Sequence, residues 1–276
     1  ALISAGISRV VVALQDPDPR VSGKGIARLR EAGLEVEEGV EQDTARRQQV
    51  GFLSRVVRGR PYLTLKLALT IDGRIATASG ESRWITGPDA RRRVHIERAR
   101  YDAVLVGAGT ARIDNPDLTV RGLGIERQPV RIVASRHLRL PKNPRLLADT
   151  SSSPVWLVCE ENSSGHDDEI TQSGARLIGV PSLGSHLDLS AMLTRLGDEG
   201  LTRVFCEGGG TIAASLLSAG LVDELLVFSA GLVLGAEGQP ALGALGVSSL
   251  AEASRFQLEK VVPIGSDVMQ VWVRAD

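Results

Sequence analysis

The chain has 276 residues, 43% of them hydrophobic, which is enough to bury a core in one large domain or in two unequal domains. The formal net charge of −1 excludes a global positive field that would attract nucleic acid. The longest apolar stretches fall short of the roughly 20 residues that span a membrane. We therefore expect a cytoplasmic protein with no nucleic-acid or membrane partner.

The first sixty residues predict a small β-α-β-α segment. The expected elements, in chain order, are a buried strand at Val10–Leu14, a helix at Lys24–Ala32, a strand at Leu34–Glu37 and a helix from an N-cap at Asp43 to about Val57. A segment of this length is marginal as an independent domain. Gly59-Arg60-Pro61 marks a break after it, so we predict one unit at residues 1–59 and a second at 60–276.

Beyond the break, short apolar runs alternate with helical patterns, which is typical of a parallel sheet. The predicted strands are Tyr62–Leu69, Ala103–Val106, Val130–Ala134, Val155–Cys159, Arg203–Cys206 and Glu224–Phe228, and the predicted helices are Pro88–Arg100, Leu189–Leu196 and Ile212–Ala219. Phe256–Val262 and Val268–Val273 flank a hairpin signal, and Asn162–Asp168 is predicted to be a polar surface loop. We therefore predict an α/β fold with a mostly parallel central sheet, flanking helices and a C-terminal antiparallel hairpin.

The glycine-rich segment Glu207–Thr211 joins a predicted strand directly to a predicted helix. Three consecutive glycines let the backbone approach a ligand closely and adopt positive φ. The helix that follows presents free N–H groups and its positive dipole end, where phosphate binds well. Open α/β sheets also bind ligands at the carboxyl ends of their strands. The segment indicates a phosphate site, with a tight turn that binds no ligand as the alternative.

Three further features are weaker signals when each is taken alone. Gly107–Thr110 and Asp114–Asp117 follow another predicted strand, but on their own they are typical of an ordinary loop. Trp84 either covers a cofactor face or anchors the core, and by itself the core interpretation is favoured. The helix at residues 88–100 carries five arginines, and such runs are mostly solvated. Arg91 and Arg98 share one face of it, where they are able to grip a phosphate.

No metal site is expected from the sequence. His95-Ile96-Glu97 matches only half of the zinc-deaminase signature, and the P-C-x-x-C half is absent. Cys159 and Cys206 lie far apart, each in an apolar run, so we expect buried free thiols.

Several of these segments occur together, in order, in one known family. Arg60–Ala68, Asp72–Ala76 and Gly80–Gly87 closely resemble the reductase half of the bifunctional riboflavin-biosynthesis deaminase/reductase, and Gly107–Thr110, Asp114–Arg121 and Glu207–Thr211 follow in that family's order. The resemblance covers about residues 60–276. Residues 16–33 resemble the closing segment of the deaminase half, so residues 1–59 are interpreted as a remnant of it. The zinc motifs of that half would lie before Ala1. The resemblance therefore implies no deaminase activity in this chain, and zinc only if a longer natural chain supplies them.

The resemblance implies a dihydrofolate-reductase-like domain that acts on 5-amino-6-(5-phosphoribosylamino)uracil with NADPH. Hydride from the nicotinamide C4 would reach the ribose C1′, opened to a carbonyl or imine, and give the ribitylamino product. The resemblance also implies a homo-oligomer, dimer or larger.

Site residues are carried over from the family motif by motif. Substrate contacts fall on Ser82, Arg98, Leu118, Arg121 and Glu207, with Arg98 and Arg121 at the 5′-phosphate. Cofactor contacts fall on Ala68, Trp84, Thr110, Asp114, Ser135, Gly209, Gly210, Thr211, Ile212, Ala213, Ala214 and Ser215. The candidate catalytic residues are Lys66, Asp114 and Glu207. Lys66 and Glu207 are expected to polarise or protonate the opening sugar, and Asp114 to anchor a cofactor hydroxyl.

One position departs from the family pattern. Where the family tends to have Asp-Ser after the strand at residues 130–134, this chain has Ser135-Arg136. Because a carboxylate there would repel a 2′-phosphate and an arginine would attract it, we predict a preference for NADPH over NADH. Two alternatives stay open: a pterin or folate reductase of the same fold, and an inactive truncated chain that binds nucleotide.

Overall fold

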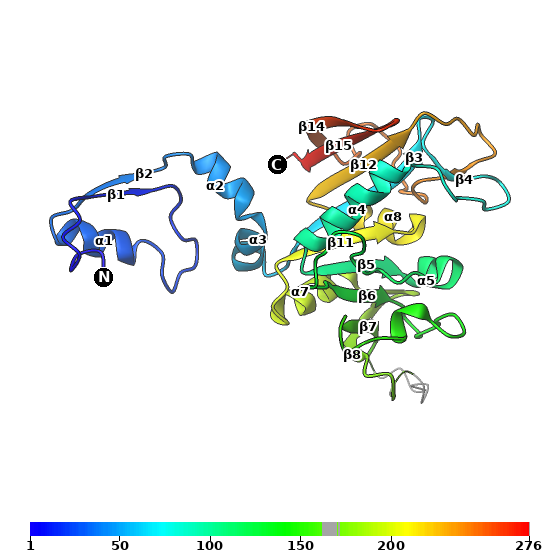
Figure 1. Cartoon of the computed structure of the whole chain (residues 1–276), viewed down its shortest axis with the longest axis horizontal. Helices are drawn as coiled ribbons and strands as arrows, with labels where there is room; N and C mark the ends of the chain where they lie inside the picture. Colours follow the sequence, from blue (N-terminus) through cyan, green and yellow to red (C-terminus); the bar gives the residue numbers. More distant parts are fainter. Residues whose placement is uncertain (162–169, 171, 276) are drawn as a thin grey trace.

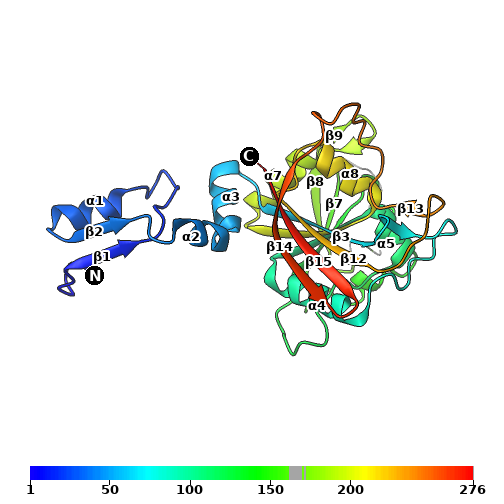
Figure 2. The same cartoon turned by 90° about the horizontal axis from the view of Figure 1, so that it is seen from above.

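The computed structural model describes residues 1–161, 170 and 172–275, so the predicted loop Asn162–Asp168 lies outside the described residues. Two parts are visible in Figures 1 and 2. A small N-terminal segment stands to one side, and a larger α/β body holds the remaining elements.

The N-terminal segment contains two strands and three helices. They are β1 (Arg9–Val12), α1 (Lys24–Glu31), β2 (Glu35–Glu38), α2 (Gln42–Gln48) and α3 (Val50–Arg58). β1 and β2 form a parallel pair of their own, separate from the main sheet. The predicted strands and first helix are confirmed, but the prediction of a buried first strand is wrong. Val11 is 52% exposed, because in the described chain β1 has only β2 as a neighbour.

The helix predicted from Asp43 to Val57 is two helices. Glu41, with a left-handed φ of 56°, precedes α2, so Asp43 lies in the first turn and is not the N-cap. A break at Gln49 separates α2 from α3, and Gly59 ends α3 with φ 68°. Ser54 of α3 is buried and donates to the carbonyl of Arg60. This contact fixes α3 against the start of the larger body.

The larger body is built on a nine-stranded sheet in the described chain, with strand order β14-β15-β12-β3-β11-β5-β6-β7-β8. Its strands are β3 (Tyr62–Thr70), β5 (Ala103–Gly107), β6 (Val130–Ala134), β7 (Val155–Glu160), β8 (Arg176–Val180), β11 (Arg203–Gly208), β12 (Glu224–Ala230), β14 (Phe256–Ile264) and β15 (Asp267–Arg274). Neighbours from β12 to β8 are parallel, whereas β15 is antiparallel to both β12 and β14. The predicted α/β class, with its mostly parallel sheet and C-terminal hairpin, is confirmed.

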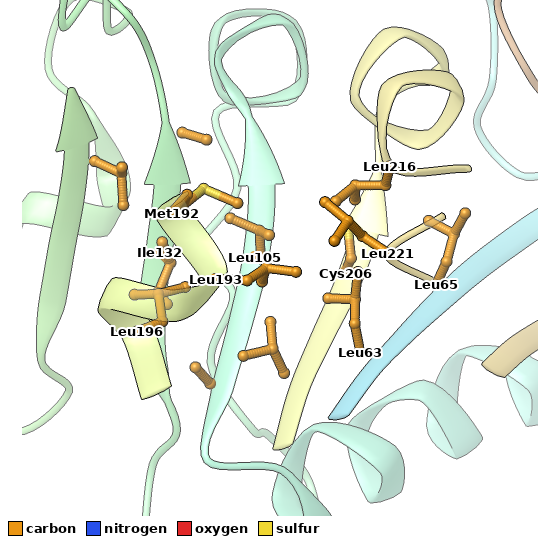
Figure 3. Close-up of a cluster of buried hydrophobic side chains, with 14 of the residues drawn as sticks. Leu63, Leu65, Leu105, Ile132, Met192, Leu193, Leu196, Cys206, Leu216 and Leu221 are labelled. Atoms are coloured by element: carbon orange, nitrogen blue, oxygen red, sulfur yellow. The ribbon is translucent and has the colours of Figure 1, made fainter. Parts of the chain in front are cut away.

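Helices cover both faces of the sheet. They are α4 (Pro88–Arg100), α5 (Ala108–Asp114), α7 (Leu189–Asp198) and α8 (Gly210–Ser218), with a 3-10 turn η1 (Arg145–Leu147). Figure 3 shows the core beneath α7 and α8, where Leu63 and Leu65 of β3 belong to one hydrophobic cluster with Leu105, Ile132 and side chains of both helices. α4 packs on the opposite face through Ala90, beside Phe205 and Phe228. Odd-numbered residues of β3 therefore face α7 and α8, and even-numbered ones face α4.

The sequence missed several short elements. β8 lies at the sheet edge, where Ile178 and Val180 are buried and Arg176 and Gly179 are exposed. α5 begins directly at the end of β5, where only a glycine turn was predicted. Short strands β4 (Arg74–Ala76) and β13 (Gln239–Pro240) pair with each other, as do β9 (Ser182–Leu183) and β10 (His186–Leu187). Cys159 and Cys206 are both buried.

Asp223 connects the N-terminal helices to the sheet. Its buried carboxylate accepts hydrogen bonds from Arg58, from both terminal nitrogens of Arg60 (2.7 and 2.8 Å) and from the backbone N–H of Leu63 (2.8 Å). We expect Asp223→Asn to lower the free energy of unfolding by about 3–5 kcal/mol, because it leaves the largely buried guanidinium of Arg60 without its counter-charge. Urea denaturation measures this, with the exposed Asp198→Asn as the control. Equal stabilities of the two variants would show that the cluster contributes nothing.

Candidate active site

The candidate site lies at the carboxyl edge of the three central parallel strands. β11 lies between β3 and β5, with Cys206 opposite Leu65 and Gly208 beside Val106. Lys66 of β3 and Glu207 of β11 each follow a residue of the α7/α8 core. Strand alternation therefore turns both side chains to the α4 face of the sheet.

Arg98 of α4 meets Glu207 on that face. Its guanidinium binds both carboxylate oxygens, with 2.9 Å from Nη2 to Oε2, and Nη1 donates to the carbonyl of Thr119 at 2.9 Å. Each of the paired side chains is only 11% exposed. Burial alone would raise the pKa of the Glu207 carboxyl, but Arg98 and then Lys66 hold that pKa below its usual value. Glu207 is therefore an anion near neutral pH and an acceptor of hydrogen bonds.

Lys66 lies within the electrostatic reach of two carboxylates. Burial lowers the pKa of its ammonium, and Glu207 and Asp114 oppose that shift. Asp114, the last residue of α5, has its own carboxyl pKa raised by burial against the effects of Arg83 and Lys66. The three predicted catalytic residues thus form one charged neighbourhood, although they come from β3, α5 and β11. A lysine with a lowered pKa releases its proton more readily than a solvated one.

The two glycine turns are in direct contact. Gly208 and Gly209 have φ of 85° and 98°, which side chains rarely adopt, and a Cβ on Gly209 would lie 2.7 Å from Oγ1 of Thr110. Thr110 donates to the carbonyl of Gly208 at 3.1 Å. The turn after β11 is therefore fastened to the start of α5 after β5. α8 begins at Gly210, so its first N–H groups, which a helix itself cannot satisfy, lie at this junction.

Several predicted cofactor residues lie along α8. Thr211, Ala214 and Ser215 line a hollow of about 380 Å³ together with His186, Ser218, Gly243 and Ala244. Ala213, by contrast, is fully buried in the core and its N–H donates to the carbonyl of Gly209 at 3.0 Å, so this residue has no free group to offer a ligand. A glycine turn with no room for a Cβ, followed by free N–H groups and an open hollow, fits the phosphates of a dinucleotide.

The other predicted cofactor and substrate residues differ in exposure. Trp84 is 69% exposed with the guanidinium of Arg91 4.4 Å from its ring centre, so the interpretation as a core anchor is wrong. Ser82 is exposed, and Ala68 packs against the core on the α4 face. The sequence could not separate these cases because a tryptophan before a helix suits either environment.

Ser135 and Arg136, predicted to meet a 2′-phosphate, already have partners. Buried Ser135 accepts a hydrogen bond from the backbone N–H of Arg139 at 3.0 Å. Arg136 binds both oxygens of Glu160, at 3.0 and 2.9 Å. Glu160 therefore offsets part of the positive charge that the sequence placed after β6.

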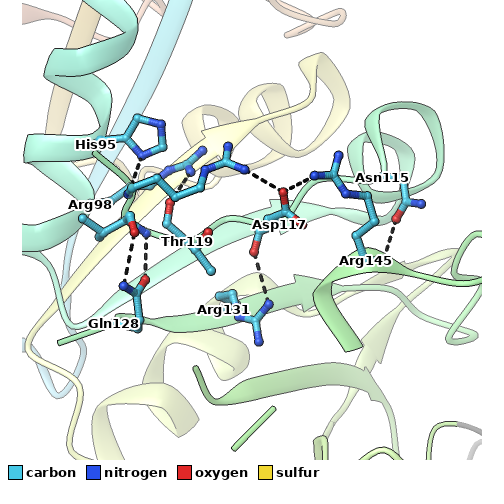
Figure 4. A network of polar contacts seen from close by, with 10 residues as sticks. His95, Arg98, Asn115, Asp117, Thr119, Gln128, Arg131 and Arg145 are labelled. Carbon is cyan, nitrogen blue, oxygen red and sulfur yellow. Dashed lines mark hydrogen bonds and ion pairs between the residues drawn. The ribbon is translucent and has the colours of Figure 1, made fainter. Parts of the chain in front are cut away.

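Residues 117–121 form a loop that is held from several sides (Figure 4). Leu118 is buried with φ 59°, and Arg121 pairs with Asp117. Four further residues, none of them expected at the site from the sequence, fix this loop. Arg131 binds the carbonyl of Asp117, and Gln128 both donates to and accepts from the backbone of Val120. His95 accepts from the N–H of Arg121, and Arg145 pairs with Asp117. Sequence reasoning missed the contacts of all four residues. The only signals nearby were the arginines of the helix at residues 88–100 and the turn residues Asp114–Asp117.

Two general features concern the described part of the chain. Its residues contain no group of three or more His, Cys, Asp or Glu side chains arranged to hold a metal ion. Among its helices, none is both long and apolar enough to cross a membrane.

The chain is similar to known proteins over nearly all its length. A family model described as the RibD C-terminal domain matches residues 61–270. The riboflavin biosynthesis protein RibD of Escherichia coli (strain K12) is 36% identical over 274 residues, covering 97% of this chain and 75% of that protein. The structure of Acinetobacter baumannii RibD gives a TM-score of 0.87 at 32% identity, covering 100% of this chain and 75% of its own.

A Thermotoga maritima structure is also similar. It is described as a diaminohydroxyphosphoribosylaminopyrimidine deaminase/5-amino-6-(5-phosphoribosylamino)uracil reductase, with a TM-score of 0.83 at 29% identity over 99% of this chain and 73% of that protein.

The fold and the comparisons define an α/β reductase domain with a candidate ligand site at the carboxyl edge of a mostly parallel sheet, preceded by a small α/β segment. The chain belongs to the RibD family. The resemblance inferred from the motifs is confirmed.

Proposed function

We propose that this chain catalyses the NADPH-dependent reduction of 5-amino-6-(5-phosphoribosylamino)uracil to 5-amino-6-(5-phosphoribitylamino)uracil. The chain is a reductase of riboflavin biosynthesis, in keeping with the RibD relatives and with the description of the Thermotoga maritima protein. One observation carries the assignment of the site. The ammonium of Lys66 interacts electrostatically with the carboxylates of Glu207 and Asp114, and it lies beside the glycine turn that contacts Thr110.

The residues at the glycine turns fit NADPH. Gly209 to Ser215 would hold its phosphates and adjacent ribose, while Thr110, Asp114, Trp84, Ala68 and Ser135 would contact the remainder. When bound, NADPH supplies the hydride for the reduction. The protein's contribution is to place the two phosphorylated molecules side by side and to exclude water between them, and such orientation accounts for a large share of the rate.

Lys66 moves the proton in this proposal. The Nζ of Lys66 donates a proton to the ribose ring oxygen as the ring opens, because burial makes its ammonium more acidic than a solvated lysine. Glu207, anionic and held by Arg98, accepts hydrogen bonds from the substrate and keeps Lys66 in place. Ser82, Leu118 and Arg121 complete the substrate contacts.

Several wider properties belong to the same proposal. We expect this chain to act in the cytoplasm as a homo-oligomer, and to have no deaminase activity, with zinc needed only if further residues supply the missing motifs. We also expect NADPH to be preferred over NADH, with Ser135 at the 2′-phosphate.

The purified chain tests the proposed function. Thermal shift with NADPH measures binding, and single-turnover absorbance at 340 nm with the aminouracil phosphate measures oxidation. We expect binding and oxidation, with lower kcat/KM for NADH. Binding without oxidation would favour an inactive nucleotide-binding chain. Turnover of dihydrofolate in place of the aminouracil phosphate would favour a folate reductase.

Gly209→Ala tests the fit of the cofactor to the glycine turn. At φ 98°, with Thr110 Oγ1 2.7 Å from the new Cβ, alanine must displace the turn. We expect the Kd for NADPH to rise by about tenfold, since backbone strain of this kind costs roughly 1–3 kcal/mol. Titration of NADPH fluorescence measures it. Gly25→Ala, on α1 with open space around its Cβ, is the control, and equal Kd values for both variants would contradict the prediction.

A further inference from the structure

The single carboxylate of the loop at residues 117–121, that of Asp117, is shared between the loop's predicted phosphate ligand Arg121 and Arg145 of η1. Oδ2 of Asp117 accepts from Nη1 of Arg121 at 2.7 Å and also from Nη2 of Arg145. One carboxylate therefore holds two guanidinium groups, and the three side chains together have a net charge of +1. If Arg121 and Asp117 stood alone, the net charge would be zero.

The three side chains lie beside the active site. The backbone N–H of Arg121 donates to Nδ1 of His95, which precedes Arg98 by one turn of α4, and Arg98 holds both Thr119 and Glu207. Figure 4 shows Arg98, Thr119, Asp117 and Arg145 along one continuous network. Arg121 and Arg145 are 57% and 56% exposed, so each keeps N–H groups available to a ligand.

Arg145 is anchored to the site through its backbone. Its N–H donates to Oδ1 of Asn115 at 2.9 Å, and Asn115 directly follows the candidate catalytic Asp114. Asn115 in turn donates to the carbonyl of Asn143 at 3.3 Å, so η1 is tied to the end of α5. Buried Arg131 holds the backbone of Asp117 from below. Arg145 is thus held both through its backbone N–H and through the pairing of its guanidinium with Asp117.

We propose that Arg145 is a second binding residue for the substrate's 5′-phosphate, with Asp117 orienting Arg145 and Arg121 toward the same anion. The proposal rests on the proposed function and extends its substrate site. A phosphate monoester carries close to two negative charges near neutral pH. Of the two arginines expected at it from the sequence, Arg98 is paired with Glu207 and Arg121 is neutralised by Asp117, so neither offers the phosphate a net charge. Arg145 supplies the missing charge, and two guanidinium forks recognise the tetrahedral anion from two sides.

Arg145→Gln tests the proposal when the phosphorylated substrate is compared with its dephosphorylated counterpart. We expect KM for the phosphorylated substrate to rise about tenfold to a hundredfold with a smaller change in kcat, because a charge-assisted hydrogen bond is lost. kcat/KM for the dephosphorylated substrate stays as in the wild type. Arg145→Lys keeps the charge and recovers part of the loss. Arg127→Gln, an exposed arginine paired with Asp102 away from Asp117, is the matched control.

The outcomes separate this inference from the proposed function. If the wild type oxidises NADPH but Arg145→Gln leaves KM unchanged, or impairs both substrates equally, the role of Arg145 at the phosphate is overturned. If the wild type oxidises no NADPH, the proposed function fails, and protection by inorganic phosphate against thermal unfolding still tests Arg145. Greater protection of the wild type than of Arg145→Gln supports the anion site, and equal protection overturns it.

Discussion

Lys66→Met is expected to lower the single-turnover rate of NADPH oxidation by about a hundredfold to ten-thousandfold, the usual contribution of a positioned general acid. Methionine keeps an unbranched side chain of similar length in a partly buried position, so the change removes the proton and the charge with little change in packing. Stopped-flow absorbance at 340 nm measures the rate, and NADPH titration checks that binding persists.

Lys66→Arg distinguishes proton transfer from charge. Arginine keeps a positive charge between Glu207 and Asp114 but does not release a proton near neutral pH. If Lys66 is the general acid, we expect the Lys66→Arg variant to oxidise NADPH nearly as slowly as Lys66→Met. If only the positive charge of Lys66 matters, Lys66→Arg should be much faster than Lys66→Met. The exposed Lys142→Met serves as the control for loss of a lysine. A near-normal rate in Lys66→Met would remove Lys66 from the mechanism.

Arg98→Ala is expected to lower the free energy of unfolding at pH 7 by about 3–5 kcal/mol, since it leaves the buried Glu207 carboxylate without its partner. It should also abolish measurable turnover, because Arg98 holds both Glu207 and the loop carbonyl of Thr119. Urea denaturation followed by circular dichroism measures the stability. The exposed Arg92→Ala on the same helix is the control, with little change expected.

The pH dependence of the Arg98→Ala effect has a definite sign. In the wild type the pKa of Glu207 lies below its unfolded value, so its contribution is present above that value and is lost as pH falls through the folded pKa. Without Arg98, burial dominates and the folded pKa lies above the unfolded one. The folded variant then binds the proton more tightly, and its deficit shrinks as pH falls from 7 toward 5. The double variant Arg98→Ala, Glu207→Gln should recover part of the loss, and a deficit independent of pH would contradict this account.

Much of the fold was predictable from local patterns. The strand Val130–Ala134 and the helix Pro88–Arg100 have the predicted bounds, and the strands of the C-terminal hairpin differ by only a few residues. In these segments the hydrophobic period, the prolines and the turn residues all indicate the same type of element with the same bounds. Prediction failed where the outcome depends on which other segments pack against an element in the folded chain. This applies to the exposed face of β1, to the edge strand β8 and to the break at Gln49.

The candidate site divides in the same way. Glycines 208–210 and the residues around them were recognisable because positive φ and a strand-to-helix junction leave a mark on the sequence. Three charged contacts left no recognisable signal in the sequence, since each joins side chains from segments far apart in the chain. They are the ion pair of Arg98 with Glu207, the cluster around Asp223 and the carboxylate of Asp117 that two arginines share.

By itself, the sequence determined the α/β class, the family and the strand-to-helix glycine turn, and it named the candidate site residues, because these depend on local composition and order. Only the tertiary structure decided which charges compensate one another. The direction in which α4 crosses the sheet brings Arg98 to Glu207, and the path of the chain after β6 brings Arg145 to Asp117. The net charge of the phosphate site is a sum over such neighbours, so no single segment of the chain contains it.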